Sequence, residues 1–171
     1  MPTAQKIFEL RTVSASLTSA TGTTAYTDGD AISAVTTNAL FTFTSTVRER
    51  SGTIIGAILH SSQNNTTLKL AAELWLFRTP IGLVADNAAF APTDAEMKTC
   101  VGVIDFAAAS WRAGSATSGA AGNALVQANQ GDMPFTDDGE SQTLYGQLVA
   151  KNAYAKVDSE IYTIDLIIQQ D

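Results

Sequence analysis

The chain has 171 residues, 45% of them hydrophobic, which is enough for one substantial core, so we expect a single domain over residues 1–171. The net charge is −7, and this balance argues against nucleic-acid binding, which needs clustered Lys and Arg. Only 16% of the residues are charged. A surface so poor in charge suits a protein packed against neighbours, or a β protein with Thr-rich exposed strands.

Short segments rich in Ile, Val, Leu and aromatic residues, separated by Gly, Asn, Ser and Pro, are typical of β-strands. In chain order we expect strands at residues 6–17, 31–35, 40–47, 53–60, 68–77, 100–106, 123–130, 143–153 and 161–169. In the first of these, Phe8, Leu10 and Thr12 are the residues expected to face inward.

Residues 68–77 are expected to be a central strand. Leu70, Ala72, Leu74 and Leu76 would share one face and enter the core, because side chains alternate along a strand. Glu73 falls on the other face, where it would be solvated or paired. Residues 161–169 alternate in the same way and indicate a half-buried antiparallel strand.

Helical signals are few. Residues 92–97 predict a helical turn with Thr93 or Asp94 near the N-cap and Glu96 in the first turn. Nine to ten short strands with at most one or two helical turns predict an all-β fold, an antiparallel β-sandwich or jelly roll. A closed barrel is the alternative, but the uneven loop lengths favour two packed sheets.

Catalytic chemistry is poorly represented. His60 is the only histidine; it follows a predicted strand, and the neighbouring serines lack a G-x-S-x-G context, so we interpret it as structural or exposed. Glu73 and Asp165 are the acids that a glycosidase would need to bring together. We interpret both as solvent-facing or ion-paired strand residues, and we expect no catalytic residues and no enzyme.

Metal and cofactor sites are also not expected. One His and one Cys cannot supply a zinc tetrad, and Cys100 lies in an apolar run that favours an inert buried thiol. Calcium is the open alternative, because acidic turns supply oxygen donors. These turns contain Asp28 and Asp30, and Asp137, Asp138 and Glu140, without EF-hand spacing.

The chain has no apolar run of membrane-spanning length, and its first residues do not resemble a signal peptide. We therefore expect no membrane partner and folding in a cytoplasm. Trp75, Trp111, Tyr26, Tyr145 and Tyr162 could stack on sugars or contact a partner.

Trp111 beside Arg112 is the better interface anchor, because Trp and Arg dominate such contacts; a residue folded over the end of the sandwich is the alternative.

Three segments carry a family resemblance: ELWLFRTP at residues 73–80, DNAAFAPTDAEMKTCVGVIDF at 86–106, and LYGQLVAKNAYAKVDSEIYTIDLIIQQD at 144–171. Together they resemble small virion structural proteins of tailed bacteriophages, of the capsid decoration (cement) type. The resemblance extends over residues 51–106 and 143–171, about half the chain, and its motifs are structural.

This resemblance implies a β-sandwich that binds the major capsid protein on the outer surface of the virion, after assembly in the host cytoplasm. It also implies self-association, for which we expect a trimer. The chain ends could add β-pairing to a neighbour, so Met1, Gln170 and Asp171 join Trp111 and Arg112 as expected interface residues. A tail-associated carbohydrate- or receptor-binding jelly roll is the alternative.

Overall fold

The structure, a computed structural model, describes residues 9–34, 37, 39–44, 51–62, 69–113, 124–128, 133–136 and 143–170, without the side chains of residues 51, 112, 113, 124–128 and 136. Eleven strands, one α-helix and one 3-10 turn lie in this part of the chain. The strands are β1 (Glu9–Thr18), β2 (Ala31–Ile32), β3 (Phe41–Thr44), β4 (Ser51–Ser61), β5 (Ala72–Phe77), β6 (Cys100–Phe106), β7 (Arg112–Ala113), β8 (Ala124–Ala128), β9 (Met133–Thr136), β10 (Thr143–Ala150) and β11 (Ile161–Gln170). The helices are α1 (Asp94–Met97) and η1 (Ala108–Ser110).

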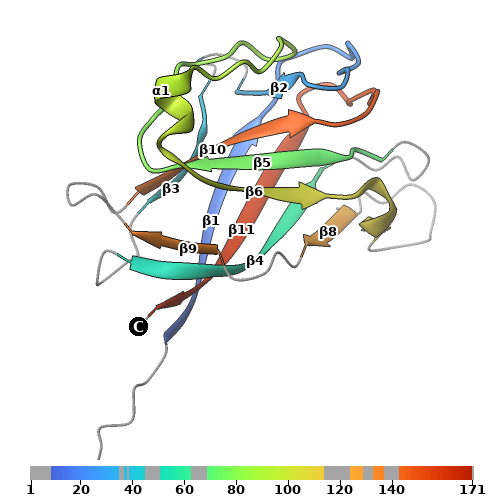
Figure 1. Cartoon of the computed structure of the whole chain (residues 1–171). Coiled ribbons are helices and arrows are strands. Elements are labelled where there is room, and N and C mark those ends of the chain that lie inside the picture. The colour runs from blue at the N-terminus through green and yellow to red at the C-terminus, as the bar shows by residue number, and fades with distance from the viewer. Residues whose placement is uncertain are drawn as a thin grey trace, which may run out of the picture.

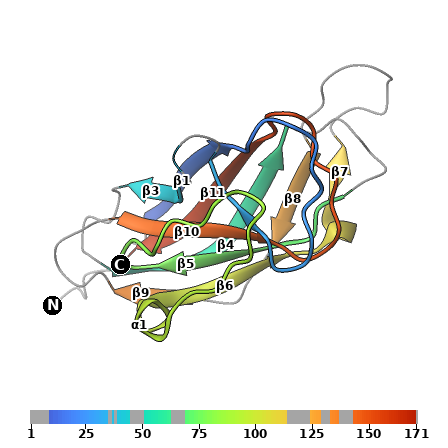
Figure 2. The same ribbon diagram turned by 90° about the horizontal axis from the view of Figure 1, so that it is seen from above.

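The strands form two antiparallel sheets that face each other (Figures 1 and 2). The first sheet has the order β1-β11-β4-β8-β7, with β9 also paired to β4; the second has the order β2-β10-β5-β6, with β3 also paired to β10. Taking β2 and β3 as one interrupted strand, and β8 and β9 as another, the chain crosses between the sheets as in a jelly roll. The expected all-β antiparallel sandwich is confirmed.

The core lies between the sheets and uses the alternation read from the sequence. Every second residue of β11 is buried, and the core-facing residues of β5 and β10 are buried as well. The largest fully buried side chains between the sheets include Tyr162, Leu74, Leu76, Ile54 and Phe106. Burial of apolar area on this scale is the main force that holds two such sheets together.

The inward face of β1 was wrongly predicted. Leu10 and Thr12 are exposed, whereas Val13 and Leu17 are buried, because the register with β11 places them opposite Leu166 and Tyr162. Phe8 lies outside the described residues.

Two short strands were not predicted, and the strands expected at residues 31–35, 68–77 and 143–153 were predicted too long. β7 lies in a stretch where no strand was expected, and β9 contains Pro134, which an edge position tolerates. β2 leaves its sheet at Ser33, whose backbone N–H donates to the Asp86 carboxylate. Residue 35, the last of the expected strand, lies outside the described part of the chain.

A long connection covers the outer face of the second sheet. Residues 78–99, hereafter the 78–99 connection, join β5 to β6 and carry α1 (Figures 1 and 2). Phe77 and Ile81 form a second buried cluster with Leu40, against which Trp75 and Phe90 pack. This sheet is therefore buried on both faces over part of its area.

Candidate interaction site

The two acids considered for glycoside hydrolysis lie on different sheets. Glu73 is on β5 and forms an ion pair with Lys151, whose Nζ lies 3.0 Å from Glu73 Oε1, whereas Asp165 is on β11. Each alternates with core residues of its own strand, so the two carboxylates point away from the sandwich on opposite sides. They cannot act on one substrate atom.

His60 is paired with an acid rather than with a nucleophile. Its Nε2 atom lies 3.0 Å from Asp165 Oδ2, and Ser14 Oγ donates to Asp165 Oδ1 at 2.5 Å. Asp165 thus stands between the hydroxyl and the imidazole, whereas a hydrolytic triad needs the imidazole between the hydroxyl and the acid. The three side chains form a cross-strand polar row.

The residues considered for metal binding do not form a cluster in the described part of the chain. No group of three or more His, Cys, Asp or Glu side chains is suitably placed there. Asp30 instead accepts hydrogen bonds from the backbone and hydroxyl of Thr27, at 2.6 and 2.8 Å. Asp137, Asp138 and Glu140 lie outside the described residues. Burial raises the pKa of the half-buried Cys100 thiol.

The expected interface residues fall into three groups. Trp111 is only 4% exposed, and its Nε1 donates to the Leu70 carbonyl at 2.6 Å. It therefore lies in the core, which agrees with the alternative of a residue folded over the end of the sandwich and not with a surface anchor. Gln170 is buried at the end of β11. The structure does not describe the side chain of Arg112, nor residues Met1 and Asp171.

Aromatic side chains do not provide an open sugar platform. Both Trp and all four Tyr residues are described, and each is buried or half-buried. Trp75 packs edge-on against Phe90 with ring centroids 5.6 Å apart, and its Nε1 donates to Glu73. These rings stabilise the fold.

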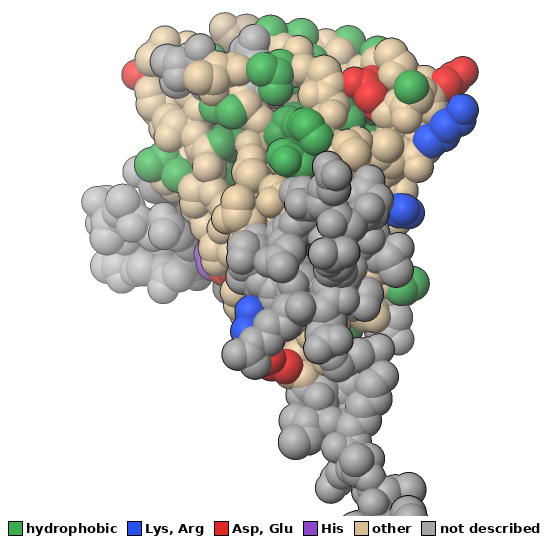
Figure 3. Space-filling model, turned by 90° about the vertical axis from the view of Figure 1, so that its left-hand side faces the viewer, with side chains coloured by type: hydrophobic (Ala, Val, Ile, Leu, Met, Phe, Trp, Pro, Cys, Tyr) green, Lys and Arg blue, Asp and Glu red, His purple; other side chains and the backbone are tan. Residues whose placement is uncertain are grey.

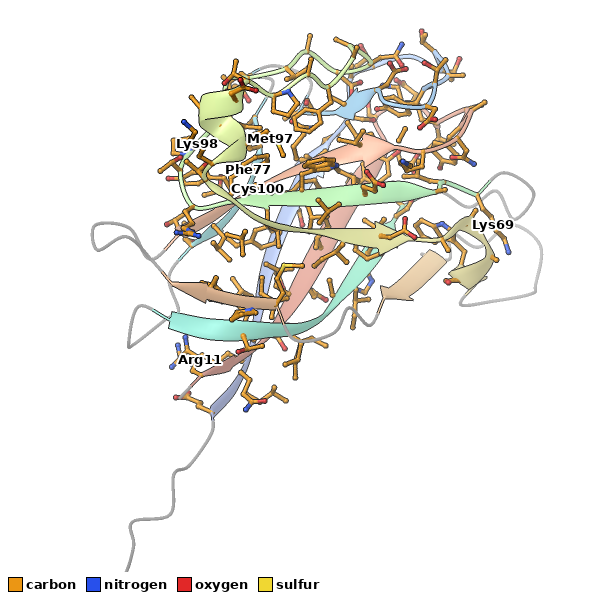
Figure 4. All side chains as sticks on the ribbon, in the orientation of Figure 1. Arg11, Lys69, Phe77, Met97, Lys98 and Cys100 are labelled. Atoms are coloured by element: carbon orange, nitrogen blue, oxygen red, sulfur yellow. The ribbon has the colours of Figure 1, made fainter. Side chains whose placement is uncertain are left out.

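Two of the four most exposed large hydrophobic side chains of the described residues lie on the 78–99 connection. Leu83 is 61% exposed and Met97, on α1, is 39% exposed. Figure 3 shows hydrophobic side chains on the upper part of the molecular face on the α1 side. Figure 4 places Met97, the last residue of α1, and Lys98, which follows it, above Phe77 and Cys100. Leu83 and Met97, with the backbone between them, are hereafter the apolar patch.

Glu96 joins the two ends of this patch. Its Oε1 atom accepts the Gly82 N–H at 2.6 Å, and its Oε2 atom accepts the Thr93 N–H and hydroxyl at 2.7 and 2.8 Å. Thr93 and Glu96 form the capping box of α1, in the turn for which the sequence predicted Thr93 or Asp94 near the N-cap. The bond to Gly82 holds its neighbour Leu83 close to α1. These donors lower the pKa of Glu96.

Asp86 anchors the middle of the connection to the sandwich. Its carboxylate accepts Lys156 Nζ at 2.6 Å, the Tyr26 hydroxyl at 2.8 Å, and the backbone N–H groups of Ser33 and Ala20 at 3.0 and 3.1 Å. The Asp86 and Lys156 side chains are 6% and 2% exposed. A buried ion pair with this many donors fixes one loop geometry.

A second buried acid lies under the same end of the sandwich. Glu160 is fully buried and accepts hydrogen bonds from Ser61, from the Tyr154 hydroxyl at 2.8 and 3.0 Å, and from the Val157 N–H at 3.3 Å. Burial raises the pKa of Glu160, and burial beside this carboxylate raises the pKa of Tyr162.

Comparison of the sequence with known families and curated proteins gives no match: no protein-family model matches the chain, and no curated protein matches it in sequence. Within the described residues, no helix is both long and apolar enough to cross a membrane.

Sequence reasoning missed the apolar patch and its anchors. The T-x-x-E spacing of Thr93 and Glu96 is the local signal that distinguishes Thr93 from Asp94 as the N-cap residue. Asp86 and Lys156 are 70 residues apart, and no local pattern marks either one as buried. Neither Glu160 nor Leu83 was singled out from the sequence.

Proposed function

We propose that this chain is a capsid decoration protein of a tailed bacteriophage. It would bind the outer surface of the head through the major capsid protein and stabilise the junctions between coat subunits. It would act by binding, with no catalytic step and no cofactor. The observation that carries this proposal is the apolar patch, an exposed hydrophobic surface held in one geometry by buried anchors.

The patch has the properties of a protein-docking surface. Exposed apolar side chains held together on one loop mark interaction sites more often than scattered ones do. A loop already ordered before binding avoids the entropic cost of ordering it in the complex. Asp86 and Glu96 supply that order here, through bonds to the sandwich and to the loop itself.

Two further observations support this role. The jelly roll is a fold of viral capsid and lectin domains, although a fold by itself does not determine function. The segment at residues 86–106 that resembles phage virion proteins includes Met97 and most of the loop around α1. In this proposal the protein is a cyclic homo-oligomer on the virion surface, expected to be a trimer, so that weak contacts act together.

Binding to undecorated heads tests the proposal. Heads assembled from the coat protein of the encoding phage, without this chain, are mixed with purified protein and sedimented. We expect stoichiometric co-sedimentation and heads that withstand higher temperature. Leu83→Asp and Met97→Asp should each weaken binding about 10- to 100-fold, since burying such a side chain contributes roughly 1.5–3 kcal/mol.

Ala107→Asp is the matched control, because it adds the same charge at an exposed position outside the 78–99 connection. Its binding should equal that of the wild type. Absence of wild-type binding to heads would contradict the proposal, and so would equal losses in the control and the patch variants. Binding to a glycan array without binding to heads would favour the carbohydrate-binding alternative.

A further inference from the structure

The two sheets differ in what covers their outer faces. The outer face of the second sheet is partly covered by the 78–99 connection through Phe77 and Ile81. On the first sheet, the outward residues of β1 and β11 are exposed or half-exposed along both strands. No described element packs across them. We refer to the outward side chains of β1, β11 and β4 as the bare face.

The bare face contains very little charge. Hydroxyl groups line β1, where Ser14 bonds to Asp165 and Ser16 Oγ lies 2.7 Å from Thr163 Oγ1. Asp165 and His60 are its only titratable groups among the described side chains, and they are paired with each other. Hydroxyl groups can both donate and accept, so the hydroxyls of one copy can form hydrogen bonds with those of another copy across an interface.

Large apolar side chains project at both ends of this face. Leu10 is 63% exposed near one end of β1, and Ile161 is 46% exposed at the opposite end of β11. With Leu83 and Met97 of the apolar patch, these are the large hydrophobic residues that the described surface exposes most. The bare face is therefore a second candidate contact surface, separate from the 78–99 connection.

Charge decides which partner fits it. The chain carries 17 acidic and 10 basic residues, so two copies repel each other through most of their surfaces. The bare face holds one carboxylate, Asp165, which is hydrogen-bonded to Ser14 and close to His60, so like-charged copies can approach there with few acids opposite acids. A basic partner, by contrast, would find only this one acid to pair with. The charge distribution thus favours a second copy of the same chain.

We infer that copies of this chain associate through the bare face of the first sheet. This inference deepens the self-association in the proposed function. The Thr18 and Ile161 ends of β1 and β11 lie at the same end of the sandwich as Asp86, which bonds to the backbone N–H of Ala20. Copies arranged around an axis along these strands would present every 78–99 connection in one direction, toward a common surface.

The mass of the full chain in solution tests this without any capsid. Light scattering over a range of protein concentrations should give a multiple of the 17.9 kDa chain. Leu10→Asp and Thr12→Glu each place an unpaired charge on the bare face and should weaken self-association about tenfold or more. Leu83→Asp, at a leucine of nearly equal exposure, is the matched control and should leave the mass unchanged.

Salt provides a second readout. Raising salt from about 0.05 to 0.5 M screens repulsion between acidic chains, so association should strengthen or stay constant. A wild-type monomer at all concentrations would overturn the inference. So would association that salt dissolves, or an unchanged mass in both folded bare-face variants. Failure of head binding with an intact oligomer would reject the proposed function alone.

Discussion

Breaking the buried ion pair of Asp86 and Lys156 tests how the 78–99 connection is held. Lys156→Met removes the cation and leaves the carboxylate with only neutral donors, the Tyr26 hydroxyl and two backbone N–H groups. Both side chains are almost fully buried, so water cannot replace the lost charge. Removing one partner of such a pair costs about 3–5 kcal/mol, which lowers the Tm of a chain of this size by about 6–20 °C.

A double-mutant cycle in urea isolates the coupling. Asp86→Asn leaves Lys156 without its anion, and the double variant should lose less stability than the two single losses combined, because no unpaired charge remains. Lys151→Met is the control: its pair with Glu73 is 41% and 23% exposed, and such pairs contribute about 0–1 kcal/mol. Additive losses, or equal losses for Lys156→Met and Lys151→Met, would refute the reasoning.

Three further predictions concern packing, pH and the thiol. Gly146→Ala would place a Cβ 2.9 Å from Leu74 Cδ1 and should cost about 1–3 kcal/mol in urea unfolding. The pKa of Glu96 is lowered from 4.5, so its stabilising effect is present above pH 4.5 and lost as the pH falls through the folded-state pKa. The pKa of Glu160 is raised from 4.5, so stability should fall as the pH rises above that value. Glu96→Gln and Glu160→Gln should remove these opposite slopes. Cys100, whose pKa is raised from 9.0, should alkylate slowly at neutral pH until urea exposes it.

For each of these three predictions, one experimental result would contradict the reasoning. An unchanged urea midpoint for Gly146→Ala would mean that Leu74 has room to move. Slopes of the same sign for Glu96→Gln and Glu160→Gln, each relative to the wild type, would contradict the assigned environments. Alkylation of Cys100 in the native chain at the rate seen in urea would show a freely accessible thiol.

The alternation of β5, β10 and β11 could be read from the sequence because each has an unbroken row of apolar residues on one face and at least one polar residue, Glu73, Gln147 or Asp165, on the other. β1 could not be read this way. It carries Leu10 on one face and Val13 and Leu17 on the other, so its own pattern is ambiguous. The register with β11 decides which face enters the core, and that pairing joins residues about 150 positions apart.

The candidate site was less predictable than the fold because its interactions are long-range. The capping box of Thr93 and Glu96 lies within four residues and was visible. Asp86 looks like any loop acid until the fold brings Lys156 to it. Trp111, taken as a surface anchor because Arg112 follows it, is buried, and its indole donates a hydrogen bond to the Leu70 carbonyl.

Anchoring and contact are assigned to different residues of the same loop, and this separation can be measured. Asp86 and Lys156 are buried and touch no partner surface, whereas Leu83 and Met97 are exposed and contribute little to the folded chain. Leu83→Asp should therefore weaken head binding with an unchanged Tm. Lys156→Met should lower the Tm, and it should weaken head binding only indirectly, because the 78–99 connection is then held less firmly. If Leu83→Asp instead destabilised the fold as strongly as Lys156→Met, the patch would belong to the core, and its role in docking would have no structural basis.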